Sequence, residues 1–429
     1  MSRISQLIDK VGETSTIRGW MFNRRGSKQI YFMQLRDGSG FIQGVVVKDE
    51  VDPEVWETVG RLKAESSVEV IGLIKAEPRA PTGCEILVKG VRPIHEVTGE
   101  YPIQKKEHGP DFLLDNRHLW LRSKKQWAIL RVRHEVIRAC REYLDGLDFI
   151  QVDAPIFTPN ACEGTTTLFE VPYFELKSYL TQSGQLYNEA AAMAHGRVYC
   201  FGPAFRAEKS KTRRHLTEFW MIEPEAAFMD WEENMDVQEG MTRHVLTRVL
   251  ERRRPELEIL ERDVTRLEKA NAPFPRVSYT EAIERLKLSG RDIAWGDDFG
   301  AEDETLLGNQ FDTPVFVTRY PTALKAFYLE PDPEDPKVAL CNDCLAPEGY
   351  GEIIGAGQRM QSEEKLEQAI DAHQLPREAF RWYLDLRTYG TVPHSGFGMG
   401  LERVVTWICG IHHLRETIPF PRMIYRNHP

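Results

Sequence analysis

The densest run of chemistry-bearing side chains begins at Arg206 and Glu208, which stand two residues apart. That spacing places both side chains on one face of an extended strand. Lysines and arginines then follow as far as His215, and an alternation of polar and apolar residues starts again at Glu218. We therefore predict a strand, a cationic loop and a second strand.

This arrangement suits a nucleoside triphosphate. An arginine can hold a phosphate through two parallel hydrogen bonds, and an aromatic ring such as that of Phe219 can carry a base. The alternative is a salt-bridged hairpin on a solvated surface, because runs of charge are usually exposed. The residues alone leave both interpretations open.

The composition limits the class of protein. The chain has 429 residues, of which 41% are hydrophobic and 28% charged, and its net charge is −10. These values are ordinary for a soluble protein of two or three domains, and they require local basic patches for any nucleic acid. No apolar run approaches the roughly 18 residues that span a membrane, and the first residues lack an apolar signal core.

The cysteines indicate a reducing compartment. There are seven, scattered along the chain, so we expect free thiols and a cytoplasmic protein. Cys341 and Cys344 form a lone C-x-x-C pair, whereas a structural zinc site needs a second pair of ligands at suitable spacing. We predict ordinary thiols there.

The first hundred residues predict a small closed barrel. Strands are expected at 16–22, 29–35, 41–47, 68–74 and 85–91, with a helix around 53–63. An OB-fold is the natural candidate, and such barrels bind single-stranded nucleic acid by stacking bases on aromatic side chains. We place this domain at 1–100, a linker rich in glycine, proline and charge at 101–122, and a second domain at 123–429.

The second domain opens with a predicted amphipathic helix. Its apolar residues recur at spacings of three, four and seven between Ser123 and Gly146, and a strand is predicted to follow at 149–152. A second strand near the site is predicted at 320–328.

Several polar side chains in this domain are costly to bury without a partner. A carboxylate and an amide such as those of Glu163 and Gln185 could meet an amino-acid ammonium, whereas isolated residues of these types are more often loop or capping groups. Two carboxylates, those of Asp343 and Glu352, flank a glycine-containing turn, and such a pair beside a triphosphate suits Mg²⁺.

The last motif combines glycines with an arginine. Gly398 and Gly400 let the backbone approach a ligand, and Arg403 stands in the first turn of an apolar helix, from which it can reach a phosphate. A lone Gly-x-Gly-x-Gly is weak evidence, so the context of the other motifs decides its meaning.

Taken together, these stretches resemble class II aminoacyl-tRNA synthetases of the aspartate/asparagine/lysine subclass. Residues 205–219 resemble motif 2, 393–403 resemble motif 3, and the helix and strand at 123–152 resemble motif 1. The segment 30–43 is similar to the anticodon-binding OB-fold of that subclass. The resemblance implies an α+β chain, with an OB barrel followed by a catalytic antiparallel sheet flanked by helices, and a homodimer built on motif 1.

The resemblance also assigns roles. It implies that catalysis uses Arg206, Glu208 and Arg403, and that ATP is bound by these three with His215, Phe219, Glu352, Gly398 and Gly400. It implies that the amino acid is bound by Glu163, Gln185, Asn188, Glu223, Glu225 and Arg359, and the metal by Asp343 and Glu352. It implies that the tRNA anticodon is bound by Phe32, Gln43 and Arg24. The subclass usually has Gly-Ser where this chain has Ala356-Gly357, so the number of magnesium ions is left open.

The amino acid is predicted from Asn188. The aspartate enzymes have lysine there to neutralise the substrate carboxylate, whereas Asn188 offers a neutral amide, and Glu223 and Glu225 add negative charge. The resemblance therefore implies activation of L-asparagine with ATP and Mg²⁺ and transfer to tRNA(Asn), without a membrane. An aspartate enzyme of relaxed tRNA choice and a paralogue that does not use tRNA are the alternatives.

Overall fold

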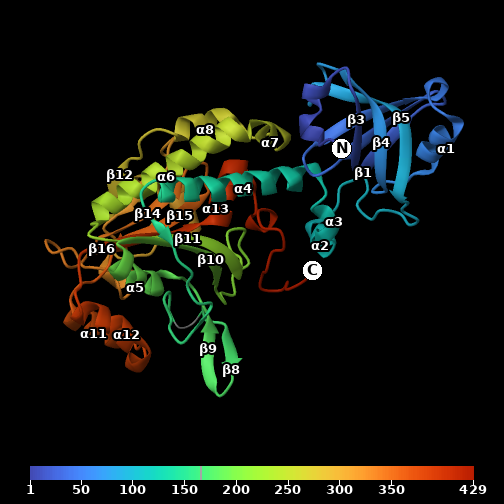
Figure 1. Ribbon diagram of the computed structural model, residues 1–429. Helices are drawn as coiled ribbons and strands as arrows, with labels where there is room; N and C mark the ends of the chain where they lie inside the picture. The colour runs from blue at the N-terminus through green and yellow to red at the C-terminus, as the bar shows by residue number, and fades with distance from the viewer. Residues whose placement is uncertain (165–166) are drawn as a thin grey trace. The chain divides into compact units, whose positions relative to one another are not determined.

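The computed structural model describes residues 1–164 and 167–429 and divides into two compact units, Met1–Leu113 and Leu114–Pro429 (Figure 1). The division falls inside the linker predicted at 101–122. The second half of that segment belongs to the second unit, because the buried Arg117 donates hydrogen bonds to the carbonyls of Ile418 at 2.7 Å and Pro419 at 2.8 Å. Within the described ranges, no helix is long and apolar enough to cross a membrane.

The first unit is a closed five-stranded barrel with strand order β1-β2-β3-β5-β4. Its elements are β1 (Thr14–Gly26), β2 (Ile30–Arg36), β3 (Phe41–Val47), α1 (Pro53–Arg61), β4 (Ser67–Ala76) and β5 (Cys84–His95), with short 3₁₀ turns at Ile4–Gln6, Ile8–Lys10 and Lys48–Glu50. Apolar and polar side chains alternate along β2, so that Met33 and Leu35 are buried in the core of the barrel while Phe32 and Gln34 point outward. All five predicted strands and the helix are present.

The second unit is built on an eight-stranded sheet with order β12-β13-β14-β15-β16-β11-β10-β6. The strands are β6 (Ile150–Gln151), β10 (Arg197–Phe205), β11 (Glu218–Ala227), β12 (Arg276–Ser278), β13 (Val315–Thr318), β14 (Cys341–Ala346), β15 (Gly351–Gln358) and β16 (His394–Gly400). The six inner strands pair antiparallel, and only the edge strands β12 and β6 pair parallel. A separate small sheet contains β7 (Phe157–Thr158), β9 (Leu176–Leu180) and β8 (Glu170–Tyr173) in that order.

Helices cover both faces of the large sheet (Figure 1). They are α2 (Pro110–Asp115), α3 (Arg117–Trp120), α4 (Lys124–Asp145), α5 (Gln185–His195), α6 (Trp231–Arg252), α7 (Arg254–Ile259), α8 (Val264–Ala270), α9 (Tyr279–Leu288), α10 (Ala301–Gly308), α11 (Glu363–Ala372), α12 (Arg377–Thr388) and α13 (Leu401–Cys409), with a 3₁₀ turn at Leu414–Glu416. α4, α6 and α13 share one hydrophobic core, and α9, α11 and α12 share another.

The local signals of the sequence explain where these elements begin and end. The side chain of Ser123 accepts a hydrogen bond from the backbone of Gln126 and caps α4, and Gly146 ends the helix, as predicted. The strand predicted at 320–328 is wrong, because the chain there forms a 3₁₀ turn, Thr322–Leu324, between irregular segments. All seven cysteines lie in the described ranges, and each is buried and unpaired.

Candidate active site

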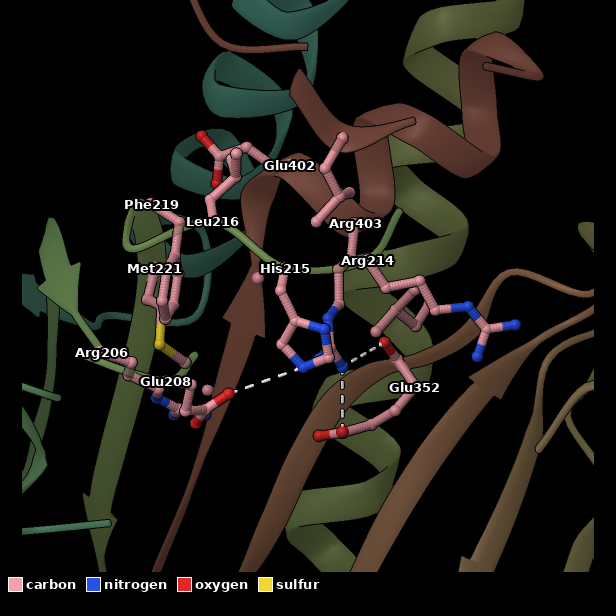
Figure 2. A pocket seen from close by; sticks show the side chains of 14 residues that line it. Arg206, Glu208, Arg214, His215, Leu216, Phe219, Met221, Glu352, Glu402 and Arg403 are labelled. Atoms are coloured by element: carbon pink, nitrogen blue, oxygen red, sulfur yellow. Dashed lines mark hydrogen bonds and ion pairs between the residues drawn. The ribbon is translucent and has the colours of Figure 1, made fainter. Parts of the chain in front are cut away.

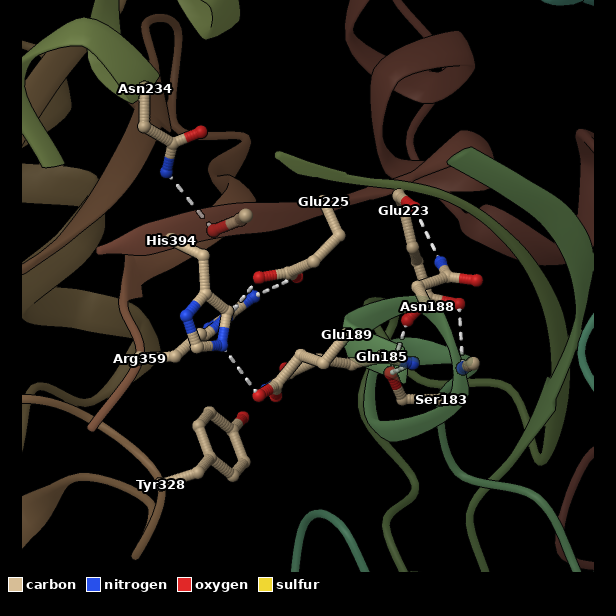
Figure 3. A network of polar contacts seen from close by, with 12 residues as sticks. Ser183, Gln185, Asn188, Glu189, Glu223, Glu225, Asn234, Tyr328, Arg359 and His394 are labelled. Atoms are coloured by element: carbon tan, nitrogen blue, oxygen red, sulfur yellow. Dashed lines mark hydrogen bonds and ion pairs between the residues drawn. The ribbon is translucent and has the colours of Figure 1, made fainter. Parts of the chain in front are cut away.

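Two adjoining cavities lie over the large sheet of the second unit. They share Arg206, Met221, Glu352 and Gly398 in their walls, so a ligand in one can reach a ligand in the other. The first holds the residues predicted for ATP (Figure 2), and the second holds most of those predicted for the amino acid (Figure 3).

Arg206 stands at the junction of the cavities. It follows directly after the end of β10, so Arg206 and Glu208 lie at the start of the loop and not on the strand as predicted. Its guanidinium carbon lies 5.4 Å from the centre of the Phe219 ring on β11. Burial lowers the pKa of Arg206, but Glu163, Glu208 and other nearby carboxylates outweigh it and leave the pKa raised. The cation is therefore permanent, and it faces the place where two ligands would meet.

His215 and Glu208 face each other across the first cavity. His215 Nε2 lies 3.6 Å from Glu208 Oε2, and the other ring nitrogen contacts the hydroxyl of Ser210 at 3.0 Å. Burial and the nearby Arg403 lower the pKa of His215, which favours the neutral ring at physiological pH. A neutral imidazole can hydrogen-bond to a phosphate or a ribose without adding a charge to a region that is already cationic.

Arg403 lies in the first turn of α13, as predicted. One of its terminal nitrogens donates to the backbone carbonyl of Glu352 and to Glu352 Oε2, both at 2.9 Å. A Cβ at Gly398 would lie 2.4 Å from Cε at the end of the Met221 side chain, and Gly400 is the N-cap of α13 in the same wall. The pairing with Glu352 aims the guanidinium into the first cavity.

Arg214 and Glu304 are two residues of this region to which the sequence analysis gave no role. Arg214 in the cationic loop donates to Glu304 Oε2 at 3.0 Å and to the hydroxyl of Thr305 at 2.7 Å, and so it ties the loop to α10. Burial, together with the neighbouring Glu352, raises the pKa of Glu304 to about 7. The cationic loop was a visible signal for Arg214, whereas nothing in the local pattern marked Glu304.

The second cavity is lined by acidic and amide groups at one end. Glu163, Gln185 and Glu223 all lie in its wall, and the hydroxyl of Tyr328 donates to Glu163 Oε1 at 3.1 Å. Gly184 N donates to Glu223 Oε2 at 2.9 Å and fixes that carboxylate. This end can accept the hydrogen bonds of an ammonium group. Tyr328 lies in the stretch that was predicted as a strand, and its role was missed.

The other end of the second cavity holds a closed ion pair. Arg359 donates from Nε and from a terminal nitrogen to the two oxygens of Glu225, both at 2.9 Å, and both side chains are buried. Burial lowers the pKa of Arg359, but Glu225 outweighs this effect and leaves the pKa raised. The guanidinium also lies 5.3 Å from the centre of the Tyr328 ring. The pair presents hydrogen-bonding groups to the cavity with no net charge.

Asn188 is buried and lines neither cavity, so the structure does not bring it to the predicted amino-acid site, and Figure 3 shows it beside Glu223. Its Nδ2 donates to the backbone carbonyl of Glu223 at 2.8 Å and contacts Cys200 Sγ at 3.2 Å. The amide is therefore used to hold β11, and its effect on a ligand passes through Glu223.

An acidic corner between the cavities contains Asp343 and Glu352. A Cβ added at Gly355 would lie 3.1 Å from Glu352 Oε1 and 3.8 Å from Asp343 Oδ1, so both carboxylates converge on one glycine. Lys325 Nζ lies 2.7 Å from Asp343 Oδ2, and burial raises the pKa of Asp343 in spite of that partner. Two convergent carboxylates supply the oxygen ligands that a divalent cation takes, and Lys325 and Arg403 are their cationic partners in this structure. Ala356 lines the cavity beside them and offers no hydroxyl.

The barrel of the first unit presents a separate candidate surface for nucleic acid. Phe32, Gln34 and Gln43 point outward from β2 and β3, and Gln34 pairs with Gln43 across the strands. Arg24 does not join them, because its side chain donates to the carbonyl of Val59 and lies 5.1 Å over the Tyr31 ring.

Arg25, unlike Arg24, lies beside Phe32. It is exposed, it is paired with Phe32 across the strands, and its guanidinium carbon lies 5.5 Å from the centre of the Phe32 ring. The alternation of a strand explains the correction, since Arg24 and Arg25 point to opposite faces.

Comparison with known proteins gives these two units a family. Residues 109–424 match tRNA synthetases class II (D, K and N), and residues 15–94 match the OB-fold nucleic acid binding domain. The chain is 57% identical over 426 residues to an asparagine–tRNA ligase of Desulforamulus reducens, with 99% of each chain covered. The chain belongs to the asparagine–tRNA ligases of the class II synthetases.

Other relatives agree with this assignment. An asparagine–tRNA ligase of Sorangium cellulosum is 56% identical, with 99% of this chain and 98% of the relative covered. The crystal structure of asparaginyl-tRNA synthetase from Pyrococcus horikoshii complexed with asparaginyl-adenylate is similar with a TM-score of 0.94 and 44% identity, covering 98% of this chain and 97% of the other. The predicted fold of an OB barrel followed by a class II catalytic domain is confirmed.

Proposed function

We propose that this synthetase condenses L-asparagine with ATP to give asparaginyl-adenylate and pyrophosphate, and then transfers the asparaginyl group to the 3′-terminal adenosine of tRNA(Asn). The asparagine–tRNA ligases to which the chain is similar carry this activity in their names. The observation that carries the choice of amino acid is the closed pair of Arg359 and Glu225 in the wall of the second cavity.

The pair selects a carboxamide by hydrogen bonding. The substrate amide oxygen accepts from Arg359 and its NH₂ donates to Glu225, so every polar group of a buried amide is satisfied. A substrate carboxylate would instead face Glu225 with Arg359 already neutralised, and burying that uncompensated charge is unfavourable. At the other end, Glu163, Gln185 and Glu223 bind the α-ammonium group. Asn188 supports Glu223 from behind.

ATP occupies the first cavity in this account. Phe219 stacks on adenine, Glu208 and His215 orient the nucleotide, and Arg403 holds the terminal phosphate. Arg206 lies in both walls, so it can contact the α-phosphate as the asparagine carboxylate attacks it. The chemistry needs no protein nucleophile, because positioning and neutralisation of charge carry the step.

Magnesium is proposed as the partner of the acidic corner. Asp343 and Glu352 would hold it, and when bound it would neutralise charge on the phosphates. Lys325, paired with Asp343, keeps that carboxylate facing the cavity.

The tRNA anticodon is assigned to the barrel, where Phe32 stacks on a base, Gln43 contacts a base edge and Arg25 contacts phosphate. We also propose a homodimer acting in the cytoplasm. Large apolar side chains are exposed near motif 1 and on the hairpin of β8 and β9, including Ile150, Phe157 and Phe174, and Phe174 is 87% exposed.

The direct test is aminoacylation. Purified enzyme, ATP, Mg²⁺, radiolabelled asparagine and a tRNA(Asn) transcript should give acid-precipitable asparaginyl-tRNA. A tRNA(Asn) transcript with a changed anticodon serves as the control and should be charged far more slowly. Charging with labelled aspartate and not with asparagine would overturn the proposal.

A further inference from the structure

Glu189 is a fully buried carboxylate that lines neither cavity, and Figure 3 shows it within a network of polar contacts. It is on α5, one helical turn after Gln185, and Gln185 Nε2 donates to Glu189 Oε1 at 3.2 Å. Gln185 lines the cavity, whereas Glu189 does not. A buried carboxylate is unfavourable unless its oxygens are fully paired, so its partners indicate what it does.

Glu189 collects partners from two other elements. On α12, the hydroxyl of Tyr383 donates to both oxygens at 2.7 and 2.8 Å, and Arg387 donates to Oε2 at 2.8 Å. On β16, His394 Nε2 lies 2.9 Å from Oε2. Burial raises the pKa of Glu189, but Arg387 and His394 outweigh it and hold the pKa well below its usual value, so the group is ionised.

The same partners hold the segment that carries Arg359. Arg387 Nε donates to the carbonyl of Met360 at 2.9 Å, and the backbone N–H of Arg359 donates to the carbonyl of His394 at 2.9 Å. One carboxylate therefore connects α5, α12 and β16 to the end of β15. Both cavity residues that depend on it, Gln185 and Arg359, are proposed to touch asparagine.

Charge gives the carboxylate a second effect. Glu189 and Glu225 balance the guanidinium groups of Arg387 and Arg359. His394 Nδ1 lies 2.8 Å from the carbonyl oxygen of Val392 and Nε2 lies 2.9 Å from Glu189 Oε2, so the ring joins the carboxylate to the start of β16.

Glu189 and Glu225 therefore supply the two negative charges that pair with these two guanidinium groups. Glu189, Glu225 and His394 could in principle form a metal site, because one ligand atom of each lies within 4.8 Å of the others. Arg359 and Arg387 already supply the positive charge that a metal ion would bring to the two carboxylates.

We infer that Glu189 is a positioning residue that sets the amino-acid specificity of this site: it fixes Gln185 and the Arg359 segment, and its negative charge keeps the cavity wall unable to compensate a substrate carboxylate. The inference rests on the proposed function, since it assumes that asparagine occupies the second cavity. Removing the charge leaves an excess of positive charge behind Arg359, and a more positive wall admits aspartate more readily.

Glu189→Gln is the sharpest variant because it keeps the size of the side chain and removes the charge. The measurement is ATP–pyrophosphate exchange with asparagine and with aspartate, together with the KM for ATP. We expect the KM for asparagine and the ratio of aspartate to asparagine exchange each to rise by roughly tenfold or more, as misplaced substrate-binding groups do. The KM for ATP should change by less than about twofold, because Glu189 touches no residue of the first cavity.

Glu135→Gln is the matched control. Glu135 on α4 is also a fully buried carboxylate, but it lines neither cavity. It pairs with Arg252 at 3.0 Å and Arg253 at 2.8 Å, at the end of α6. This variant should lower thermal stability and leave the KM for asparagine and the aspartate ratio unchanged. If Glu189 were important only as a buried charge that stabilises the fold, both variants would change the KM for asparagine and the aspartate ratio to the same extent.

The outcomes separate the two claims. Wild-type enzyme without asparagine-dependent exchange would refute the proposed function, whereas active wild type with an unchanged Glu189→Gln profile would refute only the inference. If Glu189→Gln does not fold, Tyr383→Phe removes a single donor to the same carboxylate and should raise the KM for asparagine by a smaller factor. An unchanged KM in that variant would also refute the inference.

Discussion

At the scale of single residues, the account depends on how tightly the Arg359–Glu225 pair is packed. A Cβ at Gly396 would lie 2.0 Å from Glu225 Oε2 and 2.5 Å from the carbonyl of Pro224, so the neighbouring strand must carry glycine there. Specificity is thus set partly by a residue that has no side chain.

Gly396→Ala should displace Glu225 and open the pair. We expect the KM for asparagine to rise by on the order of a hundredfold, because a displacement of about 1 Å at a reacting site costs that much. Gly202→Ala on β10 is the control, since a Cβ there meets nothing within 4 Å. Steady-state ATP–pyrophosphate exchange of both variants is the measurement, and equal KM values would contradict the packing argument.

Arg403 provides a test of the first cavity. Arg403→Ala removes the cation that Glu352 aims into the cavity, so exchange should fall by about a thousandfold while binding of tRNA is retained. Arg254→Ala, at a half-exposed arginine paired with Glu268 outside both cavities, should leave exchange unchanged. Exchange that survives in Arg403→Ala would show that ATP is held elsewhere.

The sequence predicted the residue types of the site better than their individual contacts. Phe219 lies on the second strand and Arg403 in the first turn of α13 as predicted, whereas Arg206 lines the first cavity from just beyond the strand on which it was predicted. Asn188 does not reach the predicted amino-acid site, since its pairing with the carbonyl of Glu223 depends on the packing of α5 against β11, which no local pattern records. Glu189 was missed for the same reason, because its partners on α12 and β16 lie between 194 and 205 residues away in the chain.

At the scale of elements, periodicity and caps were sufficient for the five barrel strands and for α1 and α4, whereas no expectation was stated for helices such as α9, α11 and α12. α4 begins and ends at its predicted caps, and β10 and β11 enclose the predicted cationic loop. The order of the strands was beyond such signals, since β16 lies between β15 and β11, far apart in the chain. The strand predicted at 320–328 was wrong because this stretch makes its backbone hydrogen bonds to turns and irregular segments and not to a neighbouring strand.

The last 3₁₀ turn gives a prediction about pH. His413 caps that turn by accepting the backbone N–H of Arg415 at 3.2 Å, and burial together with Arg415 lowers the pKa of His413 to about 4. Its unfolded value is about 6.5, so the unfolded chain binds the extra proton first and stability is lost as pH falls from about 6.5 towards 4.

His413→Asn keeps a capping oxygen and removes the titration. The variant should lose less of its melting temperature than the wild type between pH 7 and pH 4.5, as followed by circular dichroism. Identical pH slopes for the two proteins would mean that His413 does not contribute to acid sensitivity.

At the scale of the whole molecule, the proposed function assigns tRNA selection to the barrel and the chemistry to the second unit. Phe32→Ala on the barrel should lower kcat/KM for charging of tRNA(Asn) by roughly tenfold or more, since stacking on an aromatic contributes about 1–3 kcal/mol per base. Asparagine-dependent exchange without tRNA should not change. Ile71→Ala, at another exposed apolar residue of the barrel, is the control and should charge normally.

The central claim is that the catalytic unit recognises a neutral carboxamide, and one measurement tests it most directly. ATP–pyrophosphate exchange should be compared for asparagine and aspartate on the same preparation of wild-type enzyme, without tRNA. The closed Arg359–Glu225 pair predicts strong exchange with asparagine and exchange with aspartate lower by a factor of at least about a hundred. Comparable exchange with aspartate would contradict the account, because the pair would then have to open to bind a carboxylate.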